Sequence, residues 1–356
     1  MIKKLPIVIK DAEIVSECWT FERMAILQTS PYATDWLASH MNIFMTDSFY
    51  TYFGENFHMY RPQYYEDILN QKKINIFQIP DSQILDEIKQ KIDSGDYVVI
   101  CTMLGYNSEN NPYFHEILIY GYDDDNKCFF TTLMENRIFT ESTFPYESVS
   151  NAFPLVKKHL STDIKQFIDL STNYLPPFIT LSLKKEYNTD NSLYMAIDKL
   201  NKEISGKQTM DAGITDSMNS YGGPTVYTGI ACLVGLNNLL NRICQNAPLD
   251  EQRNGLVNVI KKLHEHRRLI LLSMKYIKDK LLLESKNIFN YETCCERVQK
   301  WYLMAMKYEI TKDKSLLFHI ICEIWPAFNE ERMVLRDFKQ EYTEALEIMW
   351  QKGLIP

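Results

Sequence analysis

The feature that most constrains the fold of this chain is a change in its hydrophobic pattern near residues 185–191. Before that point, short runs of β-branched and aromatic residues alternate with helical patches, whereas after it apolar residues recur every three or four positions. The chain has 356 residues, which is more than one hydrophobic core usually accommodates. We therefore predict an α+β fold with two domains, residues 1–185 and an all-helical domain at residues 186–356.

The charge balance excludes two classes of partner. The net charge is −8 and the sequence pI is about 5.5, whereas a nucleic-acid surface needs a basic stripe. An acidic chain is also a poor partner for an anionic membrane surface. No run of 18 apolar residues occurs, and the apolar stretch at the N-terminus is too short for a signal peptide. We expect a cytoplasmic protein that binds neither nucleic acid nor membrane.

The cysteine spacing argues against a metal site and a disulfide framework. The chain has eight cysteines, and no two of them form a Cys-x-x-Cys pair of the kind that binds zinc. We expect the thiols to be reduced, as they are in cytosolic proteins, and we predict no metal ligands.

The middle of the first domain reads as a β-hairpin preceded by a buried strand. Residues 96–104 form a continuous β-branched run, and residues 113–126 form a second strand that ends in an acidic turn. Residues 127–133 then read as the returning strand, because Asp-Asp-Asp-Asn is turn chemistry. This pattern predicts adjacent antiparallel strands.

Cys18 is the candidate nucleophile. Ser16 and Glu17 precede it and a helical pattern follows, so Ser16 is a reasonable N-cap and Cys18 falls in the first helical turn. Unpaired backbone N–H groups and the helix dipole favour a thiolate there, and a thiolate suits covalent acyl chemistry. The alternative interpretation is a small buried hydrophobic residue at a helix start.

His115 is the candidate base. It opens the strand at residues 113–126 and shares a face with Ile117 and Ile119. The alternative is a structural histidine near a strand end. A cysteine and a histidine far apart in sequence, each at the end of an element, are typical of a spatially assembled dyad, so we predict that His115 acts on Cys18.

These features together resemble a known family. A cysteine that opens a helix, a valine-rich strand and the sequence HEILIYGYDDD (residues 115–125) resemble the N-terminal family of the butirosin-biosynthesis enzyme BtrH. That family belongs to the papain-like superfamily, and the pattern is also similar to the peptidase domains of bacteriocin-exporting transporters. The resemblance covers roughly residues 10–155 and implies a papain-like fold for the N-terminal domain.

The resemblance also implies an activity. Relatives act in nonribosomal-peptide and other antibiotic biosynthesis, including a closthioamide-type condensing enzyme. By this resemblance Cys18 takes an acyl group from a carrier-protein thioester, His115 shuttles the protons, and an amine then accepts the acyl group to form an amide. The implied partners are an acyl or peptidyl carrier protein and a small-molecule or carrier-bound amine. No cofactor is implied, because the phosphopantetheine arrives on the carrier protein.

The sequence departs from the family pattern at two places. The family usually has an aspartate 16–18 residues after the histidine, where this chain has Thr131, Thr132 and Leu133. In its place we predict an orienting residue, in the order Asn136, Glu135, Thr132. Papain-like peptidases also have a glutamine about six residues before the cysteine, where this chain has an alanine. Backbone N–H groups, including that of Cys18, could supply the oxyanion hole instead.

Three aromatic residues are predicted to bind substrate, namely Trp19, Tyr221 and Tyr227, the last two from a glycine-rich segment that otherwise reads as a turn between helices. Residues 261–268 are the densest basic stretch and read as a solvated helix face or as a carrier-protein dock. Two other functions stay open. One is a cysteine peptidase or amide hydrolase, and the other is a catalytically inactive papain-like binding module.

Overall fold

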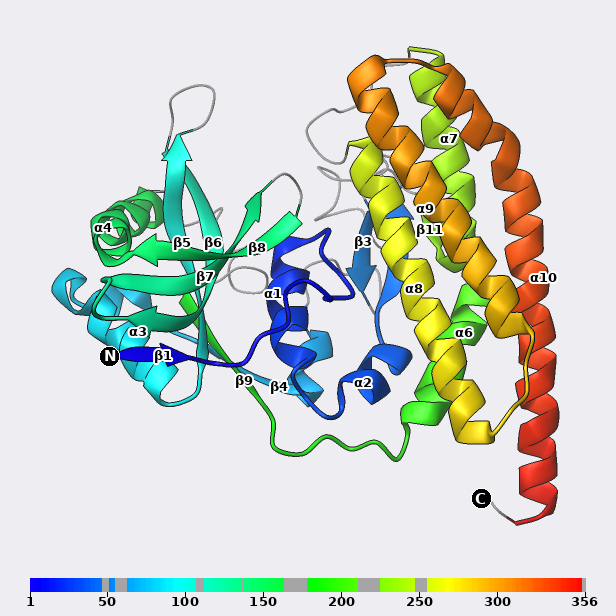
Figure 1. Cartoon of the computed structure of the whole chain (residues 1–356), viewed down its shortest axis with the longest axis horizontal. Coiled ribbons are helices and arrows are strands. Elements are labelled where there is room, and N and C mark those ends of the chain that lie inside the picture. The colour runs from blue at the N-terminus through cyan, green and yellow to red at the C-terminus, as the bar shows by residue number, and fades with distance from the viewer. Residues whose placement is uncertain are drawn as a thin grey trace. The chain divides into compact units, whose positions relative to one another are not determined.

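The computed structural model describes residues 1–46, 51–54, 63–106, 112–135, 138–162, 178–210, 225–246 and 255–353. The protein is a mixed α+β chain with an antiparallel sheet and a C-terminal helical region (Figure 1). It forms two compact units: the first is Met1–Ala33 with Tyr60–Tyr187, and the second is Thr34–Met59 with Asn188–Pro356. The division predicted from sequence, at residues 185 and 186, differs from these units in the segment Thr34–Met59.

The first unit is built on an antiparallel sheet. In order across the sheet its strands are β4 (Leu69–Lys73), β9 (Phe178–Leu183), β5 (Tyr97–Tyr106), β6 (Pro112–Asp123), β7 (Cys128–Glu135) and β8 (Ile138–Pro145), and β1 (Ile2–Lys4) pairs with β6. The three strands predicted at residues 96–133 are confirmed as β5, β6 and β7. Asp123 Oδ1 accepts hydrogen bonds from the backbone N–H groups of Asp125 and Asn126, which stabilises the acidic turn between β6 and β7.

Helices α3 (Ile84–Asp93) and α4 (Tyr146–Thr162) cover one face of this sheet (Figure 1). Isoleucines recur every four residues along α3 and are fully buried, so they form one stripe of the helix. The stripe packs against β-branched side chains of β5 and β6, in a core that includes Ile84, Ile88, Ile92, Val98, Ile100, Ile117 and Ile119. Each such side chain contributes about 1.5–3 kcal/mol by leaving water. Helix α1 (Cys18–Leu27) contacts the strand β9 of the same sheet.

Short 3₁₀ turns complete the described part of the first unit. They are η1 (Gln63–Asp67), η2 (Ile76–Gln78) and η3 (Asp81–Gln83).

The second unit is mainly helical, as predicted, but it also contains a small antiparallel sheet. Its helices are α2 (Ala33–Ser39), α6 (Ser192–Ile204), α7 (Cys232–Cys244), α8 (Leu256–Leu281), α9 (Asn287–Thr311) and α10 (Ser315–Gln351), with a 3₁₀ turn η5 (Gly229–Ala231). The sheet has the order β10 (Gln208–Met210), β11 (Thr225–Thr228), β2 (Asn42–Thr46), β3 (Thr51–Gly54). The expectation that residues 186–356 are wholly helical is wrong, because two short strands form there and one of them, β11, pairs with β2 from before residue 60.

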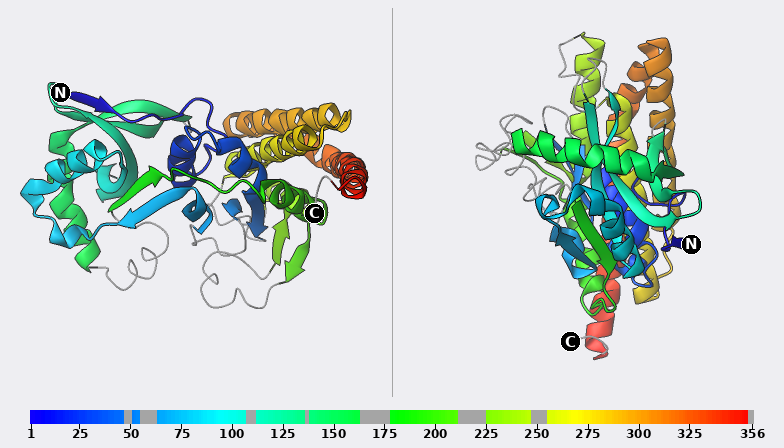
Figure 2. Two further views of the ribbon diagram at one scale, coloured as in Figure 1. Left: turned by 90° about the horizontal axis from the view of Figure 1, so that it is seen from below. Right: turned by 90° about the vertical axis from the view of Figure 1, so that its left-hand side faces the viewer.

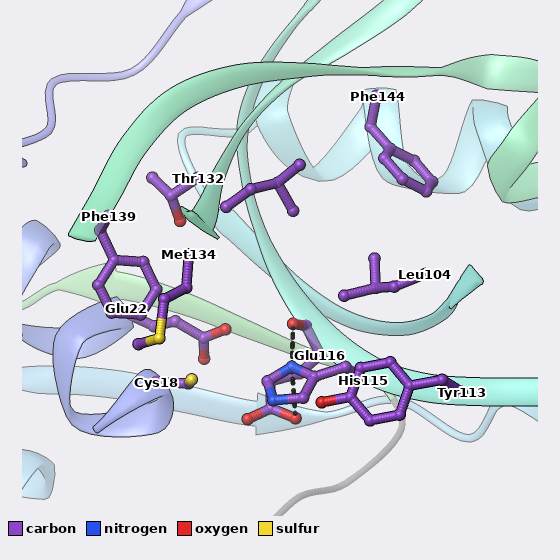
Figure 3. A pocket seen from close by; sticks show the side chains of 11 residues that line it. Cys18, Glu22, Leu104, Tyr113, His115, Glu116, Thr132, Met134, Phe139 and Phe144 are labelled. Atoms are coloured by element: carbon purple, nitrogen blue, oxygen red, sulfur yellow. Dashed lines mark hydrogen bonds and ion pairs between the residues drawn. The ribbon is translucent and has the colours of Figure 1, made fainter. Parts of the chain in front are cut away.

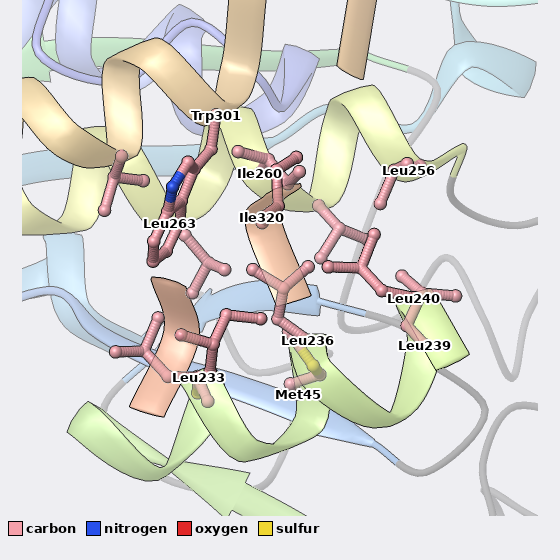
Figure 4. Packing of buried hydrophobic residues seen from close by; sticks show 14 of the residues in the cluster. Met45, Leu233, Leu236, Leu239, Leu240, Leu256, Ile260, Leu263, Trp301 and Ile320 are labelled. Atoms are coloured by element: carbon pink, nitrogen blue, oxygen red, sulfur yellow. The ribbon is translucent and has the colours of Figure 1, made fainter. Parts of the chain in front are cut away.

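The long helices of the second unit enclose an apolar core. Helices α8, α9 and α10 run alongside one another (Figures 1 and 2). Four leucines of α7 point towards Ile260 and Leu263 of α8 and Trp301 of α9 (Figure 4). The indole Nε1 of Trp301 donates to Glu323 Oε2 at 2.7 Å, which satisfies its polar atom at the edge of this core. No helix in the described ranges combines the length and apolar character needed to cross a membrane.

A buried charged cluster lies next to that core. Arg267 of α8 is fully buried, and its Nε lies 3.2 Å from Glu331 Oε1 on α10. The same carboxylate oxygen accepts a hydrogen bond from the hydroxyl of Tyr291 at 2.8 Å. The expectation of a solvated face for residues 261–268 is therefore wrong for Lys262, His266 and Arg267, which are buried, and these three cannot form a carrier dock.

Candidate active site

A cavity of about 420 Å³ opens in the first unit where β6 and β7 separate. The antiparallel pairing of β6 with β7 runs from Asp123 opposite Cys128 to Leu118 opposite Thr132. Residues of β5, β6, β7 and β8 at the end of this ladder and beyond it line the cavity together with residues of α1 (Figure 3). They are Cys18, Glu22, Leu104, Tyr113, His115, Glu116, Thr132, Leu133, Met134, Phe139 and Phe144. The cavity thus brings together both members of the predicted dyad.

Cys18 is the first residue of α1, as the sequence predicted. The N-cap is Glu17, with extended backbone angles, so the expectation that Ser16 caps this helix is wrong. The Glu17 carboxylate instead accepts a hydrogen bond from the Thr20 hydroxyl at 2.7 Å. The side chain of Glu17 is longer than that of serine, and it accepts from the Thr20 hydroxyl rather than from the first backbone N–H groups of α1.

The thiol of Cys18 lies in an acidic environment. Burial raises its pKa to about 12, and the acidic side chains of Glu116, Glu22 and Glu17 act in the same direction when they are ionised. A backbone N–H beside the sulfur lowers the pKa but does not offset these effects. The dipole at the start of α1 was expected to favour a thiolate, and the structure instead favours the neutral thiol at neutral pH.

His115 is oriented by its sequence neighbour. Its Nδ1 lies 2.8 Å from the main-chain oxygen of Glu116 and 3.4 Å from Oε2 of the same residue. A carbonyl oxygen can only accept a hydrogen bond, so Nδ1 carries a proton and the neutral ring keeps its lone pair on Nε2. In Figure 3 the Cys18 thiol and the His115 imidazole are turned into the same space. Nε2 is therefore the nitrogen that can accept a proton in the cavity.

Among the predicted orienting residues, only Thr132 has a side chain that the structure describes, and it is not one of these partners. Thr132 lines the cavity, but both recorded polar contacts of the His115 ring are to Glu116. The backbone of Glu135 pairs with Ile138 at the end of β7, and Asn136 lies outside the described residues. The physical reason is register: Thr132 is opposite Leu118, three residues along β6 from His115.

Glu22 is the second carboxyl group of the cavity. It follows Cys18 by four residues on α1, so the two side chains share one helix face. Its side chain is 3% exposed, and burial together with the charge of Glu116 raises its pKa well above the usual range. Arg23 acts in the opposite direction, but its Nη1 is 4.0 Å from Glu22 Oε2 and donates instead to the Trp19 main-chain oxygen.

Two of the three aromatic residues predicted to bind substrate, Trp19 and Tyr227, do not line the cavity. Trp19 is buried within the first unit, where its ring meets that of Tyr65 edge-on at 6.2 Å, and it does not line the cavity. Tyr227 is buried in the second unit, and its hydroxyl accepts a hydrogen bond from Asn238 at 3.0 Å. Tyr221 lies outside the described residues.

The apolar walls of the cavity come from the strands. Leu104, Met134 and Phe139 are among them, and the ring of Phe139 stacks on Phe21 of α1 at 3.7 Å. This stacking joins the helix that begins with Cys18 to the sheet that carries His115. A cavity with one thiol, one imidazole and mostly apolar walls can hold an acyl chain with its carbonyl near the sulfur.

Sequence reasoning missed the role of Glu116 in shaping this site, although its position directly after His115 was a visible signal. The sequence did indicate that Glu17 and Glu22, close to Cys18 along the chain, would oppose a thiolate there. Within the described ranges, no group of three or more His, Cys, Asp or Glu residues is arranged to hold a metal ion. No family model and no curated protein sequence matches this chain.

Proposed function

We propose that this protein is a cysteine-dependent acyltransferase that forms amides from carrier-protein thioesters, with a papain-like N-terminal domain. The observation that supports this most strongly is that Cys18, at the start of α1, and His115, on β6, line one cavity. A helix that begins with the nucleophilic cysteine, packed on an antiparallel sheet that supplies the histidine, is the arrangement of a papain-like site. The resemblance of residues 115–125 to the BtrH family adds the substrate class.

The proposed reaction has two steps. As the Cys18 sulfur attacks the thioester carbonyl, its proton moves to Nε2 of His115, and the phosphopantetheine thiolate leaves with that proton. This gives a Cys18 acyl-enzyme. An amine then attacks the acyl-enzyme, His115 removes the amine's proton, and the Cys18 thiolate leaves and is protonated again. Because a thioester is more reactive than an amide, the transfer needs no ATP and no metal.

A neutral resting thiol is compatible with this reaction. A thiol whose proton is removed as the new bond forms does not have to be ionised beforehand, provided that a base is within reach. The tautomer of His115 leaves Nε2 available for that role. The partners in this proposal are a carrier protein and an amine acceptor in natural-product biosynthesis in the cytoplasm.

One observation favours a second candidate, a papain-like module that binds a partner without catalysis. Burial, with the acidic side chains of Glu116, Glu22 and Glu17, raises the pKa of Cys18 to about 12, and buried thiols of this kind are usually inert. A hydrolase that uses the same dyad with water as acceptor is the third possibility. The three candidates differ in whether Cys18 becomes acylated and in what then releases the acyl group.

The test is an intact-mass measurement. The protein is incubated with a carrier protein loaded with a simple aromatic or β-amino acyl thioester, and the same is done with Cys18→Ala, His115→Gln and, as a matched control, the exposed thiol variant Cys322→Ala. We expect an acyl adduct in the wild type and in Cys322→Ala, none in Cys18→Ala, and much slower formation in His115→Gln. Release by an added amine, faster than by water, distinguishes the transferase from the hydrolase. An adduct that persists in Cys18→Ala, or none on the wild type with several donors, overturns the catalytic proposal and leaves the binding module.

A further inference from the structure

Glu22 combines three properties that its neighbours do not share. It lines the cavity, its side chain is 3% exposed, and its Oε2 has no hydrogen-bond partner within the described part of the chain. Buried polar oxygens almost always have a partner, so an unsatisfied one on a side chain that lines a cavity points to a group that binds there. Figure 3 shows the carboxyl group beside Cys18.

The surrounding charges decide the protonation state of this carboxyl group. Glu116 of β6 opposes a negative charge on Glu22, and Arg23 on α1 supports one only weakly at 4.0 Å. The Arg23 guanidinium donates instead to the Trp19 main-chain oxygen and to Gln71 Oε1, at 2.9 and 3.0 Å. Burial therefore prevails and raises the pKa of Glu22 well above its usual range, which favours the neutral carboxylic acid with its O–H donor.

We propose that Glu22 is a catalytic residue that donates a hydrogen bond, as a neutral carboxylic acid, to the oxyanion formed when Cys18 attacks an acyl carbonyl. The inference rests on the proposed acyl transfer at Cys18. It answers a question raised by the sequence, since the position six residues before Cys18 is Ala12 and offers no side-chain amide. Glu22 follows Cys18 by one helical turn, and its carboxylic acid supplies the hydrogen-bond donor that Ala12 lacks.

The step balances without a further reactant. The Cys18 proton passes to Nε2 of His115, the sulfur forms a bond to the carbonyl carbon, and the π electrons of the carbonyl move to its oxygen. Glu22 keeps its proton and donates a hydrogen bond to that oxygen, a contact that strengthens as charge develops. When the tetrahedral intermediate collapses, the C–S bond to the pantetheine breaks, and the departing thiolate takes the proton from His115.

Two substitutions at this position give opposite predictions. Glu22→Gln replaces the O–H donor with an amide N–H donor of the same shape, so we expect the rate of acyl-enzyme formation at pH 7 to stay within about threefold of wild type. Glu22→Met has a similar volume but no donor, so we expect this rate to fall by about 10²–10³-fold, the usual loss of one oxyanion-hole donor. Glu17→Gln is the matched control, because it removes another carboxylate near the thiol that does not line the cavity.

A pH profile separates this role from a purely structural one. Above the raised pKa of Glu22 the wild-type carboxyl ionises and loses its donor, so acylation should decline there, whereas Glu22→Gln should lack this decline. Circular dichroism of each variant establishes that it is folded, and a chemically independent readout is the binding of a small aldehyde, which forms a hemithioacetal with Cys18. We expect the aldehyde to bind Glu22→Met at least tenfold more weakly than Glu22→Gln.

The outcomes distinguish the two proposals. If the wild type forms an acyl-enzyme and folded Glu22→Met forms it equally fast, the inference about Glu22 is wrong and the proposed function stands. A loss of activity in Glu22→Gln equal to that in Glu22→Met also refutes it, because a donor is then not what the site requires. If the wild type forms neither acyl-enzyme nor hemithioacetal at Cys18, the proposed function itself fails, and the inference with it.

Discussion

Replacing Glu116 with glutamine tests the electrostatic account of the site directly. Of the charged groups that raise the pKa of Cys18, Glu116 has the largest effect, after burial. The substitution removes that charge and leaves the main-chain oxygen that accepts from Nδ1 of His115 in place. The imidazole should therefore keep its orientation while the thiol becomes more acidic.

The size of the effect follows from the thiolate fraction. A thiol with a pKa of about 12 is ionised in about one molecule in 10⁴ at pH 8, against roughly a quarter for an unperturbed cysteine. A nearby carboxylate typically changes a pKa by about one to two, so Glu116→Gln should increase the thiolate fraction about 10- to 100-fold. A less basic thiolate is also a weaker nucleophile, with a Brønsted coefficient of about 0.4–0.5, which leaves a net gain of about 3- to 16-fold in reaction rate.

The assay is alkylation by iodoacetamide between pH 6 and 10, with quenching at intervals and mass analysis of the peptide that contains Cys18. Exposed Cys322 serves as an internal reference in the same sample. Glu147→Gln is the matched control, because Glu147 is an exposed carboxylate of α4 that does not line the cavity. Wild-type Cys18 should react far more slowly than Cys322.

Two results would refute this reasoning. The first is a wild-type Cys18 that reacts as fast as Cys322 at pH 8, because such a thiol is neither desolvated nor opposed by carboxylates. The second is a Glu116→Gln profile identical to that of Glu147→Gln. The charge of Glu116 would then have no influence on the sulfur.

Three further predictions concern the base and the second unit. His115→Gln should slow acyl-enzyme formation by about 10²–10⁴-fold without changing the circular dichroism spectrum, and an unchanged rate would remove the histidine from the mechanism. Arg267→Met leaves a buried carboxylate unpaired and should lower the free energy of unfolding in urea by about 3–5 kcal/mol, whereas Arg297→Met, in a more exposed ion pair, should change it by about 1 kcal/mol or less. Gly229→Ala should cost about 1–3 kcal/mol in the same measurement, since Gly229 has φ +54° and an added Cβ would lie 2.8 Å from the main-chain oxygen of Glu203; a smaller loss would show that the turn relaxes.

Local sequence patterns were sufficient to predict the helices and strands that surround the site. The run of β-branched residues at 96–104, the acidic turn after residue 122 and the apolar periodicity beyond residue 191 each depend on neighbours a few positions away. For the same reason the first-turn position of Cys18 was predictable, although its cap was not. The pairing of a cysteine with a distant histidine came from chemistry and resemblance, and the cavity in the first unit contains both residues.

Only the tertiary structure determined which residue contacts His115, which distant strands pair and which charged side chains are buried. The orienting group of His115 was sought on β7 and just after it, but the pairing of β6 with β7 ends at Leu118. Among the described residues, the polar contacts of the His115 ring are to Glu116. Residues 34–59 join the second unit because β2 pairs with β11, about 180 residues later, and no local pattern encodes such a pairing. Nor could sequence reveal that Arg267 is buried in an apparently solvated basic stretch. Protonation states, register and burial all depend on which distant groups come within a few ångströms, and that is set by the packed fold rather than by spacing along the chain.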